Sequence, residues 1–432
     1  MNLQKQTIRL IASLILLTFY VCPASAAGPA YVTGPDAAQP GQPYRWSGNS
    51  ARYRTDKGNL GNQGNEQANA LVASAFQVWQ NVSTASISFP NEGELDYDVT
   101  GANVLSFQNS LGNCSDSSQP TNAVIYDLDG SVIYALGLDK NSVLGFAGVI
   151  CTNDTAGTYT RGWAVLNGRF IDGQPDTSGH RSVSLDDFKA VFIHEFGHLI
   201  GLGHSQVNLN CMADAGCSAE DLAGLPTMFP LFLDSSQATL KTDDIASVSL
   251  LYPAASFNST TGRIQGHVLF SDGITPAQGY NVIARQTDNP RSKAVSCVSG
   301  YLFTAGVGNP LVPDGNDISL FYGSHDSSLI GYYDIAGLPP GSYIVEVEAI
   351  NNSGADPFVG DIGVGPIGEY LGFQFKMPGN CSLQYLNYSS LPGNNCSAQS
   401  TLLVGAGQVL DTNTDIILTG TPPRFDAWEE DP

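Results

Sequence analysis

The sequence is short of basic residues. In 432 residues, 18 Lys and Arg stand against 40 Asp and Glu, which gives a formal net charge of −22. A negative field of this size argues against nucleic acid or an anionic membrane as a partner. No C-x-x-C pair occurs, which argues against a zinc–thiolate site. No apolar run of membrane-spanning length follows the first residues, so we expect an exported soluble protein long enough for two domains.

The amino-terminal segment has the features of an export signal. Lys5 and Arg9 flank an apolar run, Leu10–Val21, that is too short for a membrane helix, and Ala24-Ser25-Ala26 fits a cleavage site. We therefore predict a signal peptide at residues 1–26 and a secreted or periplasmic location.

Cysteine usage fits such a location. Of 8 cysteines, all but Cys22 lie beyond the predicted signal, and in an oxidising compartment most of these seven should pair. Closeness in sequence favours the pairs Cys211 with Cys217 and Cys381 with Cys396. Cys114 with Cys151 is the third predicted pair. Cys297 is then the candidate for the unpaired cysteine.

Histidine is scarce, with 6 in the chain, yet three occur in one short motif. His194, Glu195, His198, Gly201 and His204 have the offsets H-E-x-x-H-x-x-G-x-x-H. Residues four apart share a helix face, so His194 and His198 can present imidazole nitrogens to one ion. Gly201 can end the helix in a left-handed conformation, which allows His204 to return as a third ligand.

Glu195 lies beside the two helical histidines and is predicted to act on water rather than to bind the metal. Three protein ligands leave a fourth position open, as in catalytic Zn²⁺ sites. The alternative is a buried amphipathic helix with incidental histidines. Chance should produce the full pattern in roughly one such chain in a hundred thousand, which favours the metal site.

A second candidate metal site lies at Asp127-Leu128-Asp129-Gly130-Ser131. Its alternate carboxylates and glycine resemble part of a calcium loop, with Asp127 and Asp129 as candidate Ca²⁺ ligands. The later positions of an EF-hand loop do not fit, so a plain Asp–Gly turn is the favoured alternative.

Local patterns predict the surrounding elements. Apolar spacing predicts a helix over Asn65–Val82, and alternation predicts a strand at Ala85–Phe89. The stretch Asn122–Val149 resembles two more strands around turns, with Leu144–Val149 as the expected edge strand beside the cleft. Ser184 is the predicted N-cap of the helix that carries the histidines, and Thr242 that of a final helix before Pro253.

Three stretches, H-E-F-G-H-L-I-G-L-G-H-S, T-M-F-P and D-D-I-A-S-V-S-L-L-Y-P, together resemble the catalytic domain of matrixin-type metzincins. The resemblance covers about Tyr44–Pro253 within a predicted domain of residues 27–253. It implies an α+β fold, with a twisted mixed sheet plus three helices, and zinc endopeptidase activity. It also implies His194, His198 and His204 as ligands, Glu195 as general base, and Met228 as the residue of a tight turn beneath the metal, with Met212 as a weaker alternative.

The sequence departs from matrixins in three respects. No propeptide with a zinc-blocking cysteine lies between Ala27 and Trp46, the segment between His204 and Met228 is long, and His180 is the only other histidine of this domain, too few for the structural zinc site of animal matrixins. Latency by that route is therefore not expected, and substrate preference does not transfer.

After Pro253 the pattern changes. A small polar linker at 254–261 precedes a region, 262–420, whose alternation is typical of an antiparallel β-sandwich. Long inserts at Ala305–Asp326 and Pro357–Asn395 interrupt this region, and a tail at 421–432 follows it. The phrases G-R-I-Q-G-H-V, D-G-I-T-P-A and G-Y-Y-D-I-A-G-L-P-P-G-S-Y-I-V-E-V resemble carboxypeptidase regulatory-like modules, which are accessory rather than catalytic.

The sequence thus predicts a secreted zinc metalloendopeptidase that acts on a protein or peptide substrate. A secreted binding or adhesion protein with a catalytically idle zinc scaffold is the alternative, and the intact Glu195 and open coordination position argue against it. An enzyme that acts on a small ester or amide is a third interpretation, because activated water attacks those bonds too.

Overall fold

The computed structural model describes residues 28–34, 37–177, 179–212, 217–233, 235–302, 324, 326–349, 383–386 and 399–419. The predicted signal peptide, the predicted Cys381–Cys396 pair, the tail and most of both inserts lie outside the described residues.

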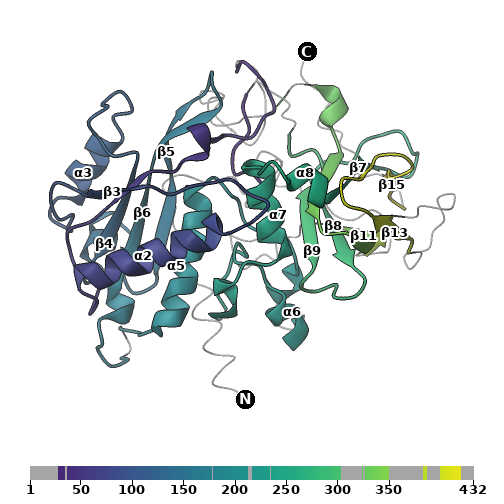
Figure 1. Cartoon of the computed structure of the whole chain (residues 1–432). Coiled ribbons are helices and arrows are strands. Elements are labelled where there is room, and N and C mark those ends of the chain that lie inside the picture. Colours follow the sequence, from purple (N-terminus) through teal and green to yellow (C-terminus); the bar gives the residue numbers. More distant parts are fainter. Residues whose placement is uncertain are drawn as a thin grey trace, which may run out of the picture.

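The first part of the chain forms a six-stranded mixed sheet in the order β1-β6-β4-β2-β3, with β5 beside β6 (Figure 1). Its strands are β1 Arg45–Trp46, β2 Tyr53–Thr55, β3 Asn91–Glu94, β4 Asn122–Asp127, β5 Gly145–Asn153 and β6 Thr158–Asn167. The pairs along the path are parallel, whereas β5 runs antiparallel to β6. The mixed sheet is confirmed, and β5 is the edge strand that was predicted at Leu144–Val149.

Helices cover both faces of this sheet. The longer ones, α2 (Asn65–Gln80) and α5 (Leu185–Leu199), share one face, where the rings of Phe76 and Phe196 stack with centroids 3.9 Å apart. The short α3 (Val104–Leu111) and α4 (Ser131–Ala135) contribute to a second core on the other face.

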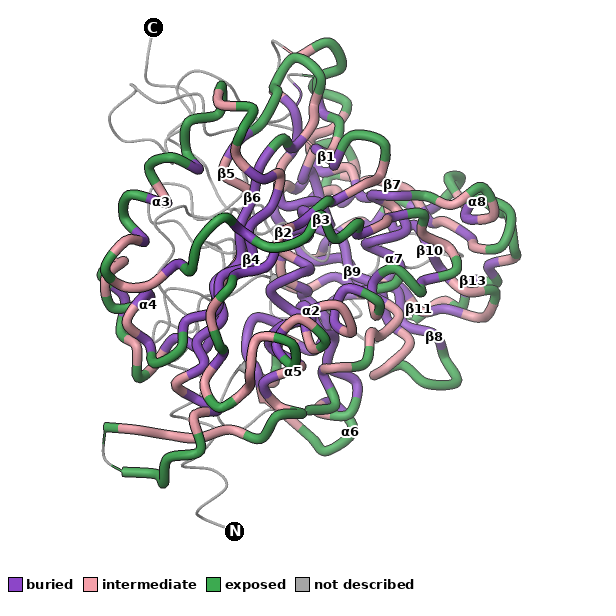
Figure 2. Tube along the Cα trace, turned by 60° about the vertical axis from the view of Figure 1, so that its left-hand side comes forward, coloured by how far each residue is buried: buried purple, intermediate pink, exposed green. Residues whose placement is uncertain are grey.

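The central strand β4 shows why the sheet is covered on both sides. All six of its residues are buried, with Val124 and Tyr126 in the core under α2 and α5, and Ala123 and Ile125 in the opposite core (Figure 2). A parallel strand buried on both faces has this continuous apolar pattern.

The further short helices are η1 Ser47–Asn49, η2 Gly168–Ile171, η3 Leu209–Met212, α6 Ala219–Ala223, η4 Ser235–Ala238, α7 Thr242–Leu251 and α8 Phe257–Thr260. Of these, η1 lies between β1 and β2, and the others follow β6 and lead to the second part of the chain. The described residues thus contain more than the three helices expected, because α3, α4 and α6 are too short to show a helical period. The predicted linker contains α8, whose Phe257 is buried.

Two predictions of local structure are wrong. Ala85–Phe89 forms only isolated bridges, and the strand occurs instead at Asn91–Glu94, because the alternation reflects burial of Ile87 and Phe89 against α2 rather than ladder pairing. The N-cap of α7 is Lys241, not Thr242. Its backbone N–H donates to the Asp244 carboxylate, while the Thr242 hydroxyl donates to the carbonyl of Ser292.

The second part of the chain contains two sheets. One comprises β7 Gly262–Leu269, β10 Tyr332–Leu338, β14 Val409–Leu410 and β15 Ile416–Ile417. The other comprises β8 Tyr280–Gln286, β9 Ala294–Val298, β11 Gly341–Ala349, β12 Leu383–Tyr385 and β13 Thr401–Val404. A 3-10 helix, η6 Ser327–Leu329, precedes β10.

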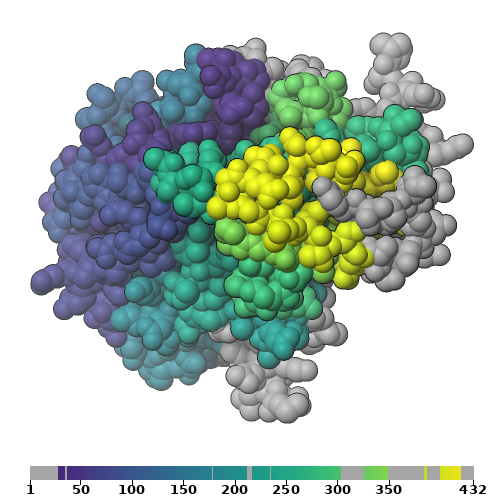
Figure 3. All heavy atoms as spheres, turned by 45° about the vertical axis from the view of Figure 1, so that its right-hand side comes forward, coloured from purple at the N-terminus to yellow at the C-terminus, as the bar shows by residue number. Residues whose placement is uncertain are grey.

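Side chains of both sheets share one core, to which Ile264, Tyr333, Val282 and Val345 belong. Alternate residues of β7 and β11 thus point into this core, in keeping with the alternation over 262–420. The expectation of a purely antiparallel domain is wrong in one respect, because β14 and β15 pair with β7 in parallel. Figure 3 shows this part, in green and yellow, lying directly against the first part.

Two predicted disulfides are confirmed, Cys114–Cys151 and Cys211–Cys217, and Cys297 is free and buried. Disulfides of this kind indicate an oxidising compartment. Within the described part of the chain, no helix combines the length and hydropathy needed to cross a membrane.

Candidate metal centre

Three imidazoles converge where α5 ends. His194 and His198 lie one turn apart on α5, and His204 lies in the loop that follows. The Nε2 atom of His198 is 3.1 Å from the Nε2 atoms of both His194 and His204. Tetrahedral zinc ligands at about 2.0–2.1 Å from the metal lie about 3.3 Å from one another. The structure therefore brings the three predicted ligands together at the spacing of a metal site, and they form the one such group of His, Cys, Asp or Glu side chains in the described residues.

The protonation of the rings also fits a metal. Nδ1 of His194 donates to the carbonyl of Thr227 at 2.7 Å, and Nδ1 of His198 donates to that of Leu202 at 2.9 Å, since a carbonyl can only accept. Burial lowers the pKa of His194 to about 3 and that of His198 to about 4, and it also lowers the pKa of His204. The Nε2 atoms of His194 and His198 are therefore both unprotonated, and their lone pairs face each other. A shared divalent cation satisfies both.

Helix α5 is fixed at its ends. The Ser184 hydroxyl accepts from the backbone N–H of Asp187 at 3.1 Å, as predicted for its N-cap. At the other end, the indole of Trp46 donates to the carbonyl of Leu199 and the hydroxyl of Tyr252 donates to that of Ile200, at 2.8 and 2.7 Å. These bonds satisfy carbonyls that a helix end leaves free.

Gly201 makes the turn that returns His204 to the other two histidines. Its φ is +91°, in the region that favours glycine, and a Cβ there would lie 2.5 Å from the ring of Tyr159. On the outer side of this turn, the backbone of Gly28 and Ala30 exchanges hydrogen bonds of 2.9 and 2.7 Å with Gly203 and Gly201. The turn is therefore held between a buried ring and the start of the described chain.

Glu195 lies against the edge strand. It is 2 % exposed, and burial raises the pKa of its carboxyl to about 8, while a hydrogen bond from the backbone N–H of Ala147 in β5 opposes that shift. A carboxyl of this kind beside a cation site can accept and release a proton near neutral pH. His194 is buried, whereas His198 and His204 are partly exposed to solvent.

Met228 packs directly under α5. A Cβ on Gly197, the residue before His198, would lie 2.2 Å from the Sδ atom of Met228, so glycine is what allows this approach. The backbone N–H groups of Thr227 and Met228 donate to the Asp244 carboxylate at 2.8 and 2.9 Å. The alternative, Met212, lies at the end of η3. Met228 thus contacts the helix that carries His194 and His198.

Sequence reasoning missed the groups that orient the predicted ligands. The carbonyls of Thr227 and Leu202 are backbone atoms and leave no motif. Asp243 and Asp244 follow the predicted N-cap Thr242, where acidic residues are common because of the helix dipole, so nothing local marks their other partners. Both are 1 % exposed, and burial raises their pKa values to about 7 and about 6.

The other candidate residues lie elsewhere. Asp127 accepts from the backbone N–H of Ile133 at 2.9 Å, and Asp129 accepts from that of Ser131 at 3.0 Å, which are the contacts of an Asp–Gly turn that opens α4. A calcium site there stays a prediction. His180 contacts Arg169 and Asp172 and does not take part in the triad.

The comparisons with known proteins name no relative: neither the models of protein families nor the curated proteins contain a match to this chain. What stands is therefore the geometry, a buried HExxH…H-type site in an α+β protein with disulfides, consistent with an extracellular metallohydrolase.

Proposed function

We propose that this protein is a secreted or periplasmic zinc-dependent endopeptidase of the matrixin-like metzincin type. The observation that carries the proposal is the convergence of the His194, His198 and His204 Nε2 atoms beside the buried carboxyl of Glu195. Met228 beneath the helix and the second, β-rich part are in keeping with the motif resemblance, which extends to a carboxypeptidase regulatory-like module.

The three imidazoles would hold the ion, and the carbonyls of Thr227 and Leu202 keep two of the rings in the tautomer that can do so. A zinc ion, when bound, supplies Lewis-acid chemistry that polarises a carbonyl and makes water nucleophilic near neutral pH. Glu195 takes the proton from the attacking water and passes it to the leaving amine.

The edge strand β5 is the proposed substrate-binding element. It pairs with β6 and with no other strand among those described, and Ala147 within it contacts Glu195. An extended peptide that adds to β5 would bring a scissile bond past Glu195, held by main-chain hydrogen bonds.

The test compares Glu195→Ala with Asp186→Ala, an exposed acid on the same helix. We expect Glu195→Ala to retain one zinc per chain and to lose roughly 10²- to 10⁴-fold in cleavage of a denatured protein. Asp186→Ala should cleave normally, and a chelator should stop cleavage by both the parent and this control. Undiminished cleavage by Glu195→Ala would refute the proposal.

The same experiment separates the alternatives. Full zinc occupancy without cleavage of any protein in a panel would favour a binding or adhesion protein. Hydrolysis of small esters or amides without cleavage of proteins would favour the small-substrate enzyme.

A further inference from the structure

The β-rich part of the chain contacts three residues of the segment that follows the third histidine directly, and it reaches the fourth through Asp243 of α7. This segment, Ser205–Asn208, is almost completely buried, with its residues between 0 and 3 % exposed. A surface loop is normally solvated, so burial of four consecutive residues calls for partners that satisfy their polar groups.

The first contact runs through Asp243 at the start of α7. The Ser205 hydroxyl donates to one carboxylate oxygen of Asp243 at 2.5 Å. The other oxygen accepts from the backbone N–H of Ser296 in β9 at 2.8 Å. The residue next to His204 is therefore tied to the β-rich part by one shared carboxylate.

The remaining contacts are direct. Asn281 of β8 donates to the carbonyl of Gln206 at 3.0 Å, and Arg285 of β8 donates to the side-chain oxygen of Asn208 at 2.9 Å. Between them, Val207 packs in a small core with Ile283 of β8 and Ala294 of β9.

These β-strand residues lie on a single face. Asn281, Ile283 and Arg285 alternate along β8, and their partners in β9 include Ser296 opposite Ile283 and Ala294 opposite Arg285. The alternate residues Val282 and Ala284 point into the shared core of the two sheets. Strand β8 is thus buried on both sides, by its own domain and by the loop after His204.

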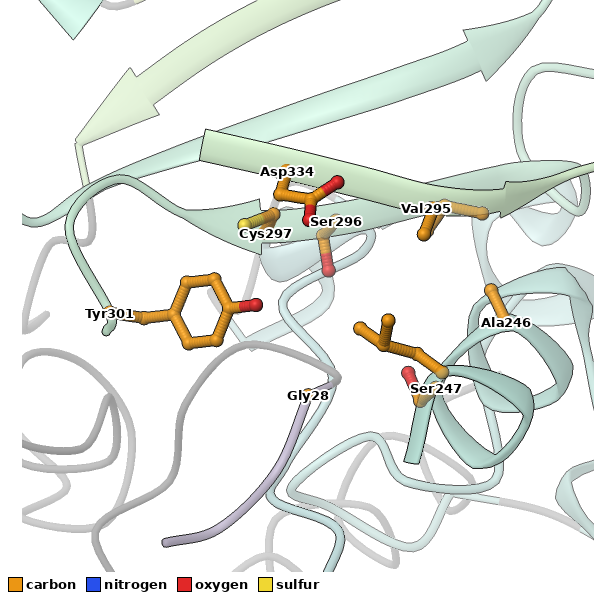
Figure 4. Close-up of a pocket in the computed structure, with 10 residues that line it drawn as sticks. Gly28, Ala246, Ser247, Val295, Ser296, Cys297, Tyr301 and Asp334 are labelled. Atoms are coloured by element: carbon orange, nitrogen blue, oxygen red, sulfur yellow. The ribbon is translucent and has the colours of Figure 1, made fainter. Parts of the chain in front are cut away.

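Helix α7 also contacts the β-rich part. Ala246 of α7 belongs to the core of the β-rich part, and Ala246 and Ser247 face Val295, Ser296 and Asp334 around a small cavity (Figure 4). The two parts therefore meet as a packed interface rather than across a flexible connection.

We propose that the β-rich part is a positioning element of the metal centre: β8 and β9 hold Ser205–Asn208 and thereby set His204 against the two histidines of α5. The inference rests on the proposed metal binding. Asn208, Asn281 and Asp243 are its positioning residues. Groups that orient a metal ligand typically change metal affinity about 10- to 100-fold when removed.

The test measures zinc affinity in the full mature chain by competition with a chromogenic chelator. Asn208→Gly is the sharpest variant, because φ at Asn208 is +59° and glycine keeps that backbone while losing the side-chain bonds to Arg285, Arg291 and Asp221. Asn281→Ala removes the contact from the opposite side. Tyr333→Phe is the control, since its hydroxyl bonds the carbonyl of Thr414 inside the β-rich part.

We expect about 10-fold or weaker zinc binding for Asn208→Gly and Asn281→Ala, an altered absorption spectrum of their Co²⁺ forms, and parent-like values for Tyr333→Phe. Circular dichroism checks folding, and if one of the two variants does not fold, the other decides. Parent-like affinity and cobalt spectrum in the folded variant would overturn the inference, as would an equal loss in Tyr333→Phe.

The readout does not depend on peptide cleavage. A parent chain that binds zinc tightly but cleaves nothing would end the proposed function and leave this inference standing. A parent that cleaves peptides, with variants that bind zinc normally, would end this inference and leave the proposed function standing.

Discussion

Replacement of Gly201 by alanine tests the turn that delivers the third histidine. At φ +91° an alanine is strained by about 1–2 kcal/mol. Its Cβ would also lie 2.5 Å from a ring carbon and 2.8 Å from the hydroxyl of Tyr159. Overpacking of this kind costs about 1–3 kcal/mol, so the two effects together amount to roughly 2–5 kcal/mol.

The Tyr159 ring cannot easily yield. It is 2 % exposed and stacks on Tyr44 with centroids 5.7 Å apart, and Trp46 and Tyr31 lie on its other sides at 5.7 and 6.3 Å. We therefore expect the clash to shift the turn as well as to destabilise the protein, and hence to weaken zinc binding through His204.

Gly137→Ala is the matched control. Gly137 has φ +84°, and a Cβ there would meet nothing within 4 Å. Both variants carry the same backbone strain and the same effect on the unfolded chain, so their difference isolates the contact with Tyr159, about 1–3 kcal/mol. Thermal unfolding and chelator competition measure the two effects. Equal melting temperatures and equal zinc affinities in the two variants would refute this reasoning.

Two further predictions concern stability. Burial raises the pKa of Asp56 from 3.8 to about 7, so between these values the folded state holds more protons than the unfolded state, and the free energy of unfolding contributed by this group falls as pH rises through that window. Urea titrations at about pH 5 and about pH 8 should show a smaller pH difference in Asp56→Asn than in the parent, and an unchanged difference would contradict the assignment. The Cys114–Cys151 bond spans 37 residues and the Cys211–Cys217 bond spans 6, for which chain entropy gives contributions of about 4 and about 2 kcal/mol. Paired replacement by alanine should lower the melting temperature more for the first bond, and the reverse order would contradict this account.

The candidate site was accessible from sequence because its signal is local. Two histidines four residues apart define a helix face, and a glycine three residues later defines the turn, so both follow from backbone geometry alone. The edge strand β5 was also predicted from a local signal, the strand-like stretch Leu144–Val149.

The contacts between the two parts of the chain were not accessible. Asn281 and Arg285 alternate with apolar residues in β8, a pattern that sequence reasoning reads as a solvated face. Their burial depends on a loop more than seventy residues away in sequence, and no local period records that. The role of Asp243 was not accessible for the same reason, since its partners Ser205 and Ser296 lie far before and far after it in the sequence.

The long separation of those contacts has a consequence for the order in which the protein matures. His194 and His198 come together as soon as α5 forms, whereas the bonds that fix the segment after His204 join residues 75 and 77 positions apart. Non-local contacts form late, because the chain must first close a long loop. We expect a newly made chain to pass through a stage with only two imidazoles in place, and the complete metal centre to form once β8 and β9 have docked. For the proposed endopeptidase, such a delay would spare neighbouring unfolded chains from digestion while the molecule is still incomplete.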